Sequence, residues 1–296
     1  MKYARLTGSA ALIGSAFLWA SAYIFVKHMV DDLSPCLLLA LRFSAAAILL
    51  LVIFFGKLKC ITRDMLLAGI KMGTALFFEF FFFTVGIKYT EASKASFIIA
   101  SYIILLPGVY YLLRRKKPAA ADILGSLVCM AGVTVLMAGN FQAINGGDVL
   151  SGLCAVAYAV HVVYSADYAK TYDGGLLNLI QISTAAVFSW ISVPVFGGMP
   201  DNLMTIPYAS ILYLALVCTI LPYFLCLFGM KYVSTTTSGI LLSFESVFAT
   251  TLAVISLHEP IYWQLVVGGA LIVGSFIISE AFRIRKTDIN EYAEVL

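Results

Sequence analysis

Glu245 is a carboxylate inside an apolar stretch of membrane-spanning length, residues 235–257, which holds no other charged side chain. In the hydrocarbon region of a bilayer a carboxylate costs several kcal/mol unless it is protonated, paired or facing water. Apolar packing gives no reason for its presence, so we predict that Glu245 lines a polar pathway, where it can take up and release a proton. The alternative is a structural hydrogen bond between helices.

Only four other charged side chains or histidines lie at a comparable depth: Arg42, Lys71, Glu79 and His161. Glu79 lies between phenylalanines at 77–78 and at 80–81 and is the pathway candidate of the first half; we expect these neighbours to face lipid or the core. Arg42 keeps its proton, so it requires a partner such as Glu79, or else it snorkels to the outer surface. Lys71 is expected to snorkel to the inner surface.

Aromatic side chains share helix faces with these groups. Tyr158 and Tyr164 lie one turn before and one turn after His161, and Trp19 and Tyr23 are four residues apart. Such side chains can line a cavity or stack against a substrate. The alternative is ordinary packing, which for His161 means a hydrogen bond within the core. Further hydrogen-bonding candidates for the pathway are Tyr102, Gln181 and Tyr223.

These residues fall on ten apolar stretches, each close to the roughly 20 residues that cross a bilayer as a helix. The stretches cover approximately residues 7–26, 34–55, 65–87, 95–113, 121–139, 149–169, 176–196, 208–230, 235–257 and 262–280. The breaks between them are short, so neighbouring helices are expected to be antiparallel. We therefore predict an all-α polytopic membrane protein with ten transmembrane helices and no soluble domain. The alternative for the first stretch is a signal peptide, since Lys2 and Arg5 precede it.

The composition excludes an ordinary soluble domain. Hydrophobic residues make up 61% of the chain and charged residues 12%, and the mean hydropathy is +0.97; about 25% of residues are charged in soluble domains. The six cysteines have no CxxC spacing, so we interpret them as small core residues rather than as a disulfide or metal framework. We expect no cofactor, no metal and no nucleic-acid partner.

The distribution of Lys and Arg between the loops predicts the orientation. With the N-terminus inside, fourteen such residues lie on the inner side and three on the outer side. The inner set is Lys2, Arg5, Lys57, Lys59, Arg63, Arg114, Arg115, Lys116, Lys117, Lys170, Lys231, Arg283, Arg285 and Lys286, and the outer set is Lys27, Lys88 and Lys94. We therefore expect both termini in the cytoplasm and the protein in the plasma or inner membrane. The run at 114–117 is interpreted as a topology anchor, with a lipid-specific site as the alternative.

The two halves of the chain repeat a pattern. Gly-Ile-Lys-Tyr at 86–89 is echoed by Gly-Met-Lys-Tyr at 229–232, a separation of 143 residues. Because each half holds an odd number of helices, the halves have opposite orientations, which predicts inverted five-helix repeats with a site between them near the midplane. We place the repeats at 1–143 and 144–281, followed by a cytoplasmic polar tail at 282–296.

Two groups of residues, one toward each end of the chain, form further patterns. The first group is Leu18-Trp19-Ala20-Ser21, Lys27, Pro35 and Arg42-Phe43. The second group is Glu245-Ser246-Val247-Phe248-Ala249, His258-Glu259-Pro260, Gln264, Gly268 and Leu271-Ile272. Together they resemble the opening and closing patterns of the EamA branch of the drug/metabolite transporter superfamily. The resemblance covers nearly the whole chain and implies ten helices in two repeats around a central cavity that opens alternately to each side.

The chain departs from the family pattern at two places. A proline usually follows the glutamate of the ninth helix, whereas this chain has Ser246, which leaves the local helix kink unassigned. In the first half, a Lys-Lys-Pro sequence at 116–118 stands where the second half has Glu259 and Pro260. This difference suggests that the two ends of the transporter are not chemically equivalent.

From the resemblance and the polar residues we expect a transporter that exports amino acids or related small polar metabolites by alternating access. Proton coupling through Glu245 is the leading hypothesis, and facilitated diffusion is the alternative. Arg42 alone is a poor phosphate clamp, so a phosphate-ester or nucleotide-sugar transporter is the second choice. An intramembrane enzyme is less favoured, because the sequence has no HExxH, no GxSxG and no Gly-rich phosphate loop. The expected partners are the substrate, the lipid bilayer and a second copy of the chain in a homodimer.

Overall fold

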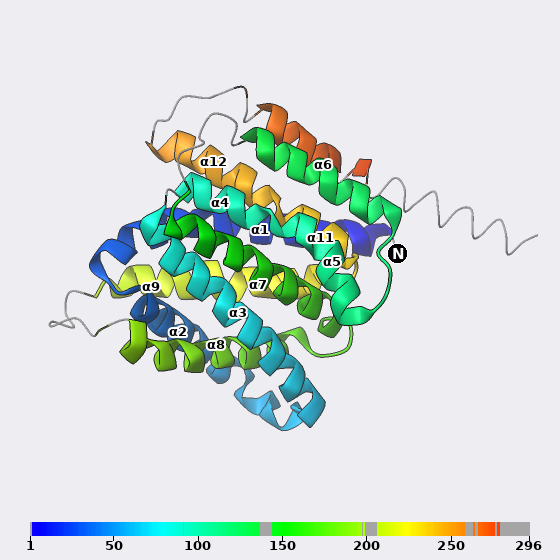
Figure 1. Cartoon of the computed structure of the whole chain (residues 1–296). Helices are drawn as coiled ribbons and strands as arrows, with labels where there is room; N and C mark the ends of the chain where they lie inside the picture. Colours follow the sequence, from blue (N-terminus) through cyan, green and yellow to red (C-terminus); the bar gives the residue numbers. More distant parts are fainter. Residues whose placement is uncertain are drawn as a thin grey trace, which may run out of the picture.

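The computed structural model describes residues 2–90, 92–136, 144–196, 198, 206–257, 263, 266–275 and 277–278. Over these residues the chain is helical and contains no strand (Figure 1). The motif at 258–260, Gln264 and the polar tail at 282–296 lie outside the described residues.

The first part of the chain forms helices α1 to α6, and the second part forms α7 to α12. The first set comprises α1 (Lys2–Asp32), α2 (Pro35–Phe54), the 3₁₀ turn η1 (Phe55–Cys60), α3 (Arg63–Tyr89), α4 (Ala92–Ala100), α5 (Tyr102–Arg114) and α6 (Ala120–Leu136). The second set comprises α7 (Gly146–Tyr168), α8 (Gly174–Phe196), α9 (Tyr208–Ala215), the π-helical turn η3 (Leu216–Ile220), α10 (Leu221–Met230), α11 (Thr235–Leu242) and α12 (Phe244–Leu257). A last helical stretch covers residues 266–275.

Seven helical segments in the described part of the chain are long and apolar enough to cross a membrane. They are Tyr3–Asp31, Pro35–Cys60, Arg63–Tyr89, Lys94–Arg114, Gly146–Tyr168, Gly174–Phe196 and Tyr208–Met230. Two shorter apolar helices cover Ala120–Val135 and Val266–Ser275. The predicted all-helical character is confirmed, while ten spans and an inverted repeat stay predictions.

Helices from both parts of the chain pack together in one bundle (Figure 1). α3 lies against α7 and α8, α2 packs on α8, and α1 packs on α10 and α12. The contact of α3 with α8 requires glycine at Gly73, because an added Cβ would lie 2.5 Å from the carbonyl oxygen of Gln181. The core is therefore shared between the two parts of the chain.

Three helical segments are interrupted near their middle. Ser101 separates α4 from α5, Ser243 separates α11 from α12, and η3 separates α9 from α10. Pro222 follows η3 and has no backbone N–H, so the carbonyl of Cys218, four residues earlier, has no α-helical donor. Such interruptions make backbone groups available inside a membrane bundle.

Polar contacts tie both ends of α7 to the interrupted segment α4–α5. Near the start of α7, Asp148 closes a capping box with Asn145 and accepts a hydrogen bond from Nζ of Lys94 in α4 at 2.6 Å. Near the end of α7, Asp167 forms an ion pair with Arg114 of α5. The helix is thus attached at one end to α4 and at the other end to α5.

Candidate functional site

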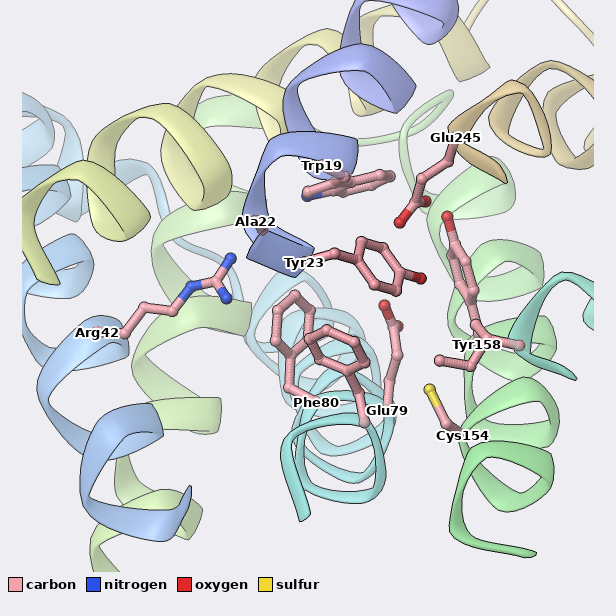
Figure 2. A pocket seen from close by; sticks show the side chains of 11 residues that line it. Trp19, Ala22, Tyr23, Arg42, Glu79, Phe80, Cys154, Tyr158 and Glu245 are labelled. Atoms are coloured by element: carbon pink, nitrogen blue, oxygen red, sulfur yellow. The ribbon is translucent and has the colours of Figure 1, made fainter. Parts of the chain in front are cut away.

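A small cavity lies at the centre of the bundle, between the two parts of the chain (Figure 2). Its volume is about 40 Å³. The lining residues are Trp19, Ala22 and Tyr23 of α1, Arg42 of α2, Glu79, Phe80 and Phe83 of α3, Ile99 of α4, Cys154 and Tyr158 of α7, and Glu245 of α12. The structure therefore brings six of the predicted pathway residues to one cavity. They come from α1, α2 and α3 of the first part of the chain and from α7 and α12 of the second part.

Glu245 occupies the first turn of α12, just after the interruption at Ser243. The apolar stretch at 235–257 is thus broken, although Ser246 replaces the proline that would explain a kink. The carboxylate is partly buried and is hydrogen-bonded to the hydroxyl of Tyr23. A helix N-terminus presents free backbone N–H groups and the positive end of the helix dipole, which stabilise a negative charge. This position therefore suits a carboxylate that forms no ion pair with the described residues.

Glu79 is buried, and its Oε2 atom lies 3.0 Å from Nδ1 of His161 on α7. The hydroxyl of Tyr23 lies between the carboxylates of Glu79 and Glu245 (Figure 2). The two carboxylates are near enough to repel each other. A proton or a cation bound between them relieves this repulsion.

A chain of buried side chains leads from Glu79 to α8. Nε2 of His161 lies 3.0 Å from Oε1 of Gln181, and Nε2 of Gln181 donates a hydrogen bond of 2.6 Å to Oδ1 of Asn178. His161 and Gln181 therefore lie behind Glu79 and are not among the residues that line the cavity. Asn178 was missed by the sequence analysis, although its position three residues before Gln181 places it on the same helix face.

Arg42 is fully buried, at 1% exposure, and its guanidinium binds neutral groups. Nε donates to Oγ1 of Thr219 at 2.7 Å, and a terminal nitrogen donates to the carbonyl oxygen of Cys218 at 2.6 Å. The guanidinium carbon also lies 4.6 Å from the ring centroid of Phe80, which adds a cation–π contact. The second terminal nitrogen, Nη1, has no hydrogen-bond partner in the described part of the chain.

Arg42 therefore has partners, as predicted, but the partner named from the sequence and the snorkelling alternative are both wrong. It forms no ion pair with Glu79, and it does not snorkel to the surface. The physical reason lies in α10, where Pro222 leaves the carbonyl of Cys218 free to accept the guanidinium. Because this acceptor lies far away in the sequence, spacing alone gave no sign of it.

Aromatic rings form one wall of the cavity and its surroundings. The ring of Tyr102 stacks on Tyr158 at 4.2 Å between centroids, and the Tyr102 hydroxyl donates to the carbonyl oxygen of Gly239 at 2.5 Å. Trp19 meets Tyr158 and Tyr223 edge-on, at 6.3 and 5.0 Å. Nε1 of Trp19 and the hydroxyls of Tyr158 and Tyr223 are buried without a partner among the described residues. Trp19 and Tyr158 line the cavity, so their groups are available as hydrogen-bond donors for a ligand, whereas Tyr223 is not among the lining residues.

The phenylalanine run at 77–83 divides between lipid and cavity. Phe78 is 44% exposed on the outside of the bundle, whereas Phe80 and Phe83 are buried and line the cavity. Phe80 thus lies in the core, as expected for a neighbour of Glu79, but it also lines the cavity, which the sequence analysis did not predict. A run of identical apolar residues carries no periodic signal that would show which face is turned inward.

Comparison with known proteins identifies the family. The model of the EamA-like transporter family matches residues 6–138 and again residues 145–280. The chain belongs to the EamA-like transporter family. An uncharacterized transporter of Archaeoglobus fulgidus is 28% identical over 276 residues, which cover 93% of this chain and 86% of that protein. The uncharacterized transporter YyaM of Bacillus subtilis is 24% identical, with 96% of this chain and 97% of that protein covered.

A solved structure has the same fold as this EamA-like transporter. That crystal structure superposes with a TM-score of 0.76 over 96% of this chain and 99% of its own, at 19% sequence identity. Together with the apolar helices, the family establishes a multi-pass membrane protein. The structure shows no group of His, Cys, Asp and Glu, among the residues it describes, that could hold a metal ion.

The cavity is small for a substrate of an EamA-like transporter. A volume of about 40 Å³ accommodates a few water molecules. Small-molecule sites in proteins usually enclose about 300–1,000 Å³. Binding of a metabolite therefore requires the helices around the cavity to separate.

Proposed function

We propose that this EamA-like transporter carries a small zwitterionic metabolite, of the amino-acid class, by alternating access. The observation that supports the proposal is the separation of charge across the cavity. Arg42, whose Nη1 atom has no hydrogen-bond partner among the described residues, lies on one side of the Tyr23 and Phe80 rings, and the two acidic side chains lie on the other (Figure 2). A guanidinium binds a substrate carboxylate, and a carboxylate binds a substrate ammonium.

Glu245 is the better partner for the ammonium group of the substrate. Glu79 already faces His161 at 3.0 Å, whereas Glu245 is hydrogen-bonded to a neutral tyrosine hydroxyl. A proton and a substrate ammonium compete for the same carboxylate. This competition couples release of the substrate to uptake of a proton, and it supports export driven by a proton gradient.

The proposed mechanism includes the predicted architecture of ten helices in two inverted repeats. The family model matches the chain twice, once in each half, which supports a repeat. The excess of basic residues in the expected inner loops supports cytoplasmic termini in a plasma or inner membrane. A homodimer stays a prediction.

The first experiment measures flux in proteoliposomes with pooled radiolabelled amino acids, in the presence and absence of a pH gradient. Wild type is compared with Glu245→Gln, which removes the charge and preserves the shape. Asp64→Asn serves as the control, because it removes an exposed carboxylate in the first turn of α3. Gradient-driven flux should fall more than tenfold in Glu245→Gln and stay unchanged in Asp64→Asn. The proposed pair is the Glu245 carboxylate with the substrate ammonium, and losing one partner of a buried charge pair costs about 2–5 kcal/mol.

Each alternative gives a different result in this experiment. Amino-acid flux that is the same in Glu245→Gln as in wild type removes Glu245 from the mechanism. Flux of sugar phosphates but not of amino acids supports the second choice, a phosphate-ester transporter. The structure disfavours that outcome, because the carboxylates of Glu79 and Glu245 would repel the phosphate group of such a substrate.

A further inference from the structure

A second hollow lies on the outside of the bundle, away from the central cavity. This groove runs between α3 and α7 and has a volume of about 470 Å³. Its lining includes Lys71, Phe78 and Phe82 of α3 and Leu153, Val156 and Tyr164 of α7. Phe78, Leu153 and Val156 are 44–47% exposed, as expected for side chains that face lipid.

The polar side chains of the groove gather at one of its ends. Gly86, near the end of α3, contacts Gly147, at the start of α7, so the two helices run antiparallel. Lys71 and Tyr164 consequently lie at the same end of the groove, with Thr74 one turn from Lys71, and apolar side chains line the remainder. Lys71 is exposed and forms no ion pair with the acidic residues of the described part of the chain.

The groove matches one leaflet of a bilayer in length. Phe82 lies eleven residues after Lys71 on α3, which corresponds to about 16 Å along a helix. Half of a hydrocarbon core of about 30 Å is nearly the same length. A cation at the headgroup end and an apolar channel of one acyl-chain length together describe the shape and chemistry of a phospholipid.

We propose that the groove between α3 and α7 binds an anionic phospholipid of the leaflet nearer to Lys71. The lipid phosphate contacts the Lys71 ammonium and the Tyr164 hydroxyl, and one acyl chain lies along Phe78, Phe82 and Leu153. An anionic headgroup is preferred because its negative charge neutralises the Lys71 ammonium. A zwitterionic headgroup carries its own cationic group, which Lys71 would repel.

The chemistry of the groove disfavours a second copy of the chain as its occupant. In a two-fold dimer the same patch meets itself, so Lys71 would be buried against a surface without an acidic side chain. Arg114, whose guanidinium carbon lies 6.0 Å from the Tyr164 ring, is already neutralised by Asp167. Among the residues that line the groove, Lys71 is therefore the cation that still requires an anion.

The test uses native mass spectrometry of the full chain in detergent with phosphatidylglycerol or phosphatidylcholine of identical acyl chains. Wild type should retain phosphatidylglycerol roughly fivefold better, the ratio that one lysine near an anionic lipid supports. Lys71→Ala should abolish this preference, and Lys71→Arg should restore it. Lys59→Ala, which removes an exposed lysine of η1 outside the groove, should leave it unchanged.

A second variant tests the acyl-chain part of the groove. Ala157→Phe fills the channel between the two helices and should lower the retention of both lipids. Equal retention of the two lipids by wild type, or a preference that survives in Lys71→Ala, would overturn the proposal. A dimer that Ala157→Phe dissociates, with no lipid preference, would assign the groove to a second copy of the chain.

Discussion

The hydroxyl of Thr219 holds the buried guanidinium of Arg42, so its removal should loosen the site. Oγ1 of Thr219 accepts from Nε of Arg42 at 2.7 Å and donates to the carbonyl oxygen of Leu214 at 2.8 Å. Thr219→Val preserves the shape of the side chain and deletes both hydrogen bonds. We expect the variant to be less stable and to bind a substrate carboxylate less well, because the guanidinium is no longer fixed.

The size of the effect follows from the two bonds that are lost. A hydrogen bond to a charged group contributes about 1.5–3 kcal/mol, and a neutral one inside a membrane bundle contributes about 0.6 kcal/mol. Their sum predicts a loss of about 2–4 kcal/mol in the free energy of unfolding. Thr219→Ser is the matched control, because it keeps both bonds and removes one methyl group, which costs about 1 kcal/mol.

The assay is reversible unfolding of the purified protein in mixed detergent micelles, with substrate flux measured on the same preparations. Thr219→Val should unfold at a lower denaturant fraction than Thr219→Ser, and its apparent KM for the substrate should rise more than its maximal rate falls. Equal stability of the two variants would refute the reasoning, since it would mean that the guanidinium does not depend on Thr219.

Three further predictions address contacts around the cavity. Tyr102→Phe removes the donor to the α11 backbone and should lower the free energy of unfolding by about 1 kcal/mol; an unchanged value would contradict the contact. His161→Ala leaves Glu79 without its neighbour at 3.0 Å and should reduce flux about tenfold or more, while full flux would confine His161 to packing. Gly73→Ala pushes α3 away from α8 and should cost about 1–3 kcal/mol. Gly152→Ala is its control, because an added Cβ there meets nothing within 4 Å, and equal losses in the two variants would refute the close approach.

The sequence predicted the helical membrane character and most of the cavity wall. A carboxylate in an apolar stretch has few physical reasons to be there, so depth alone drew attention to Glu245 and Glu79. The i, i+4 spacing of Trp19 and Tyr23 placed both on one face of α1, and both line the cavity. These inferences are local, because they need only the composition and period of one segment.

The remaining features depend on contacts between distant segments. The acceptor of Arg42 exists because Pro222 lacks an N–H, and nothing near Arg42 reveals it. The break at Ser243 occurs without the proline that usually marks one, and the carbonyl of Gly239 accepts from Tyr102 of another helix. Periodicity within one helix cannot predict such pairs, since they are set by the packing of the bundle.

The attachment of α7 to α4 at one end and to α5 at the other has a mechanical consequence. The two ion pairs belong to half-helices that meet at Ser101, so the segment α4–α5 is jointed where α7 is continuous. Because α4 and α5 can move separately about Ser101, one of them can move away from α7 while the other keeps its ion pair with α7. The interruption at Ser101 thus allows the ion pairs Lys94–Asp148 and Arg114–Asp167 to break one at a time.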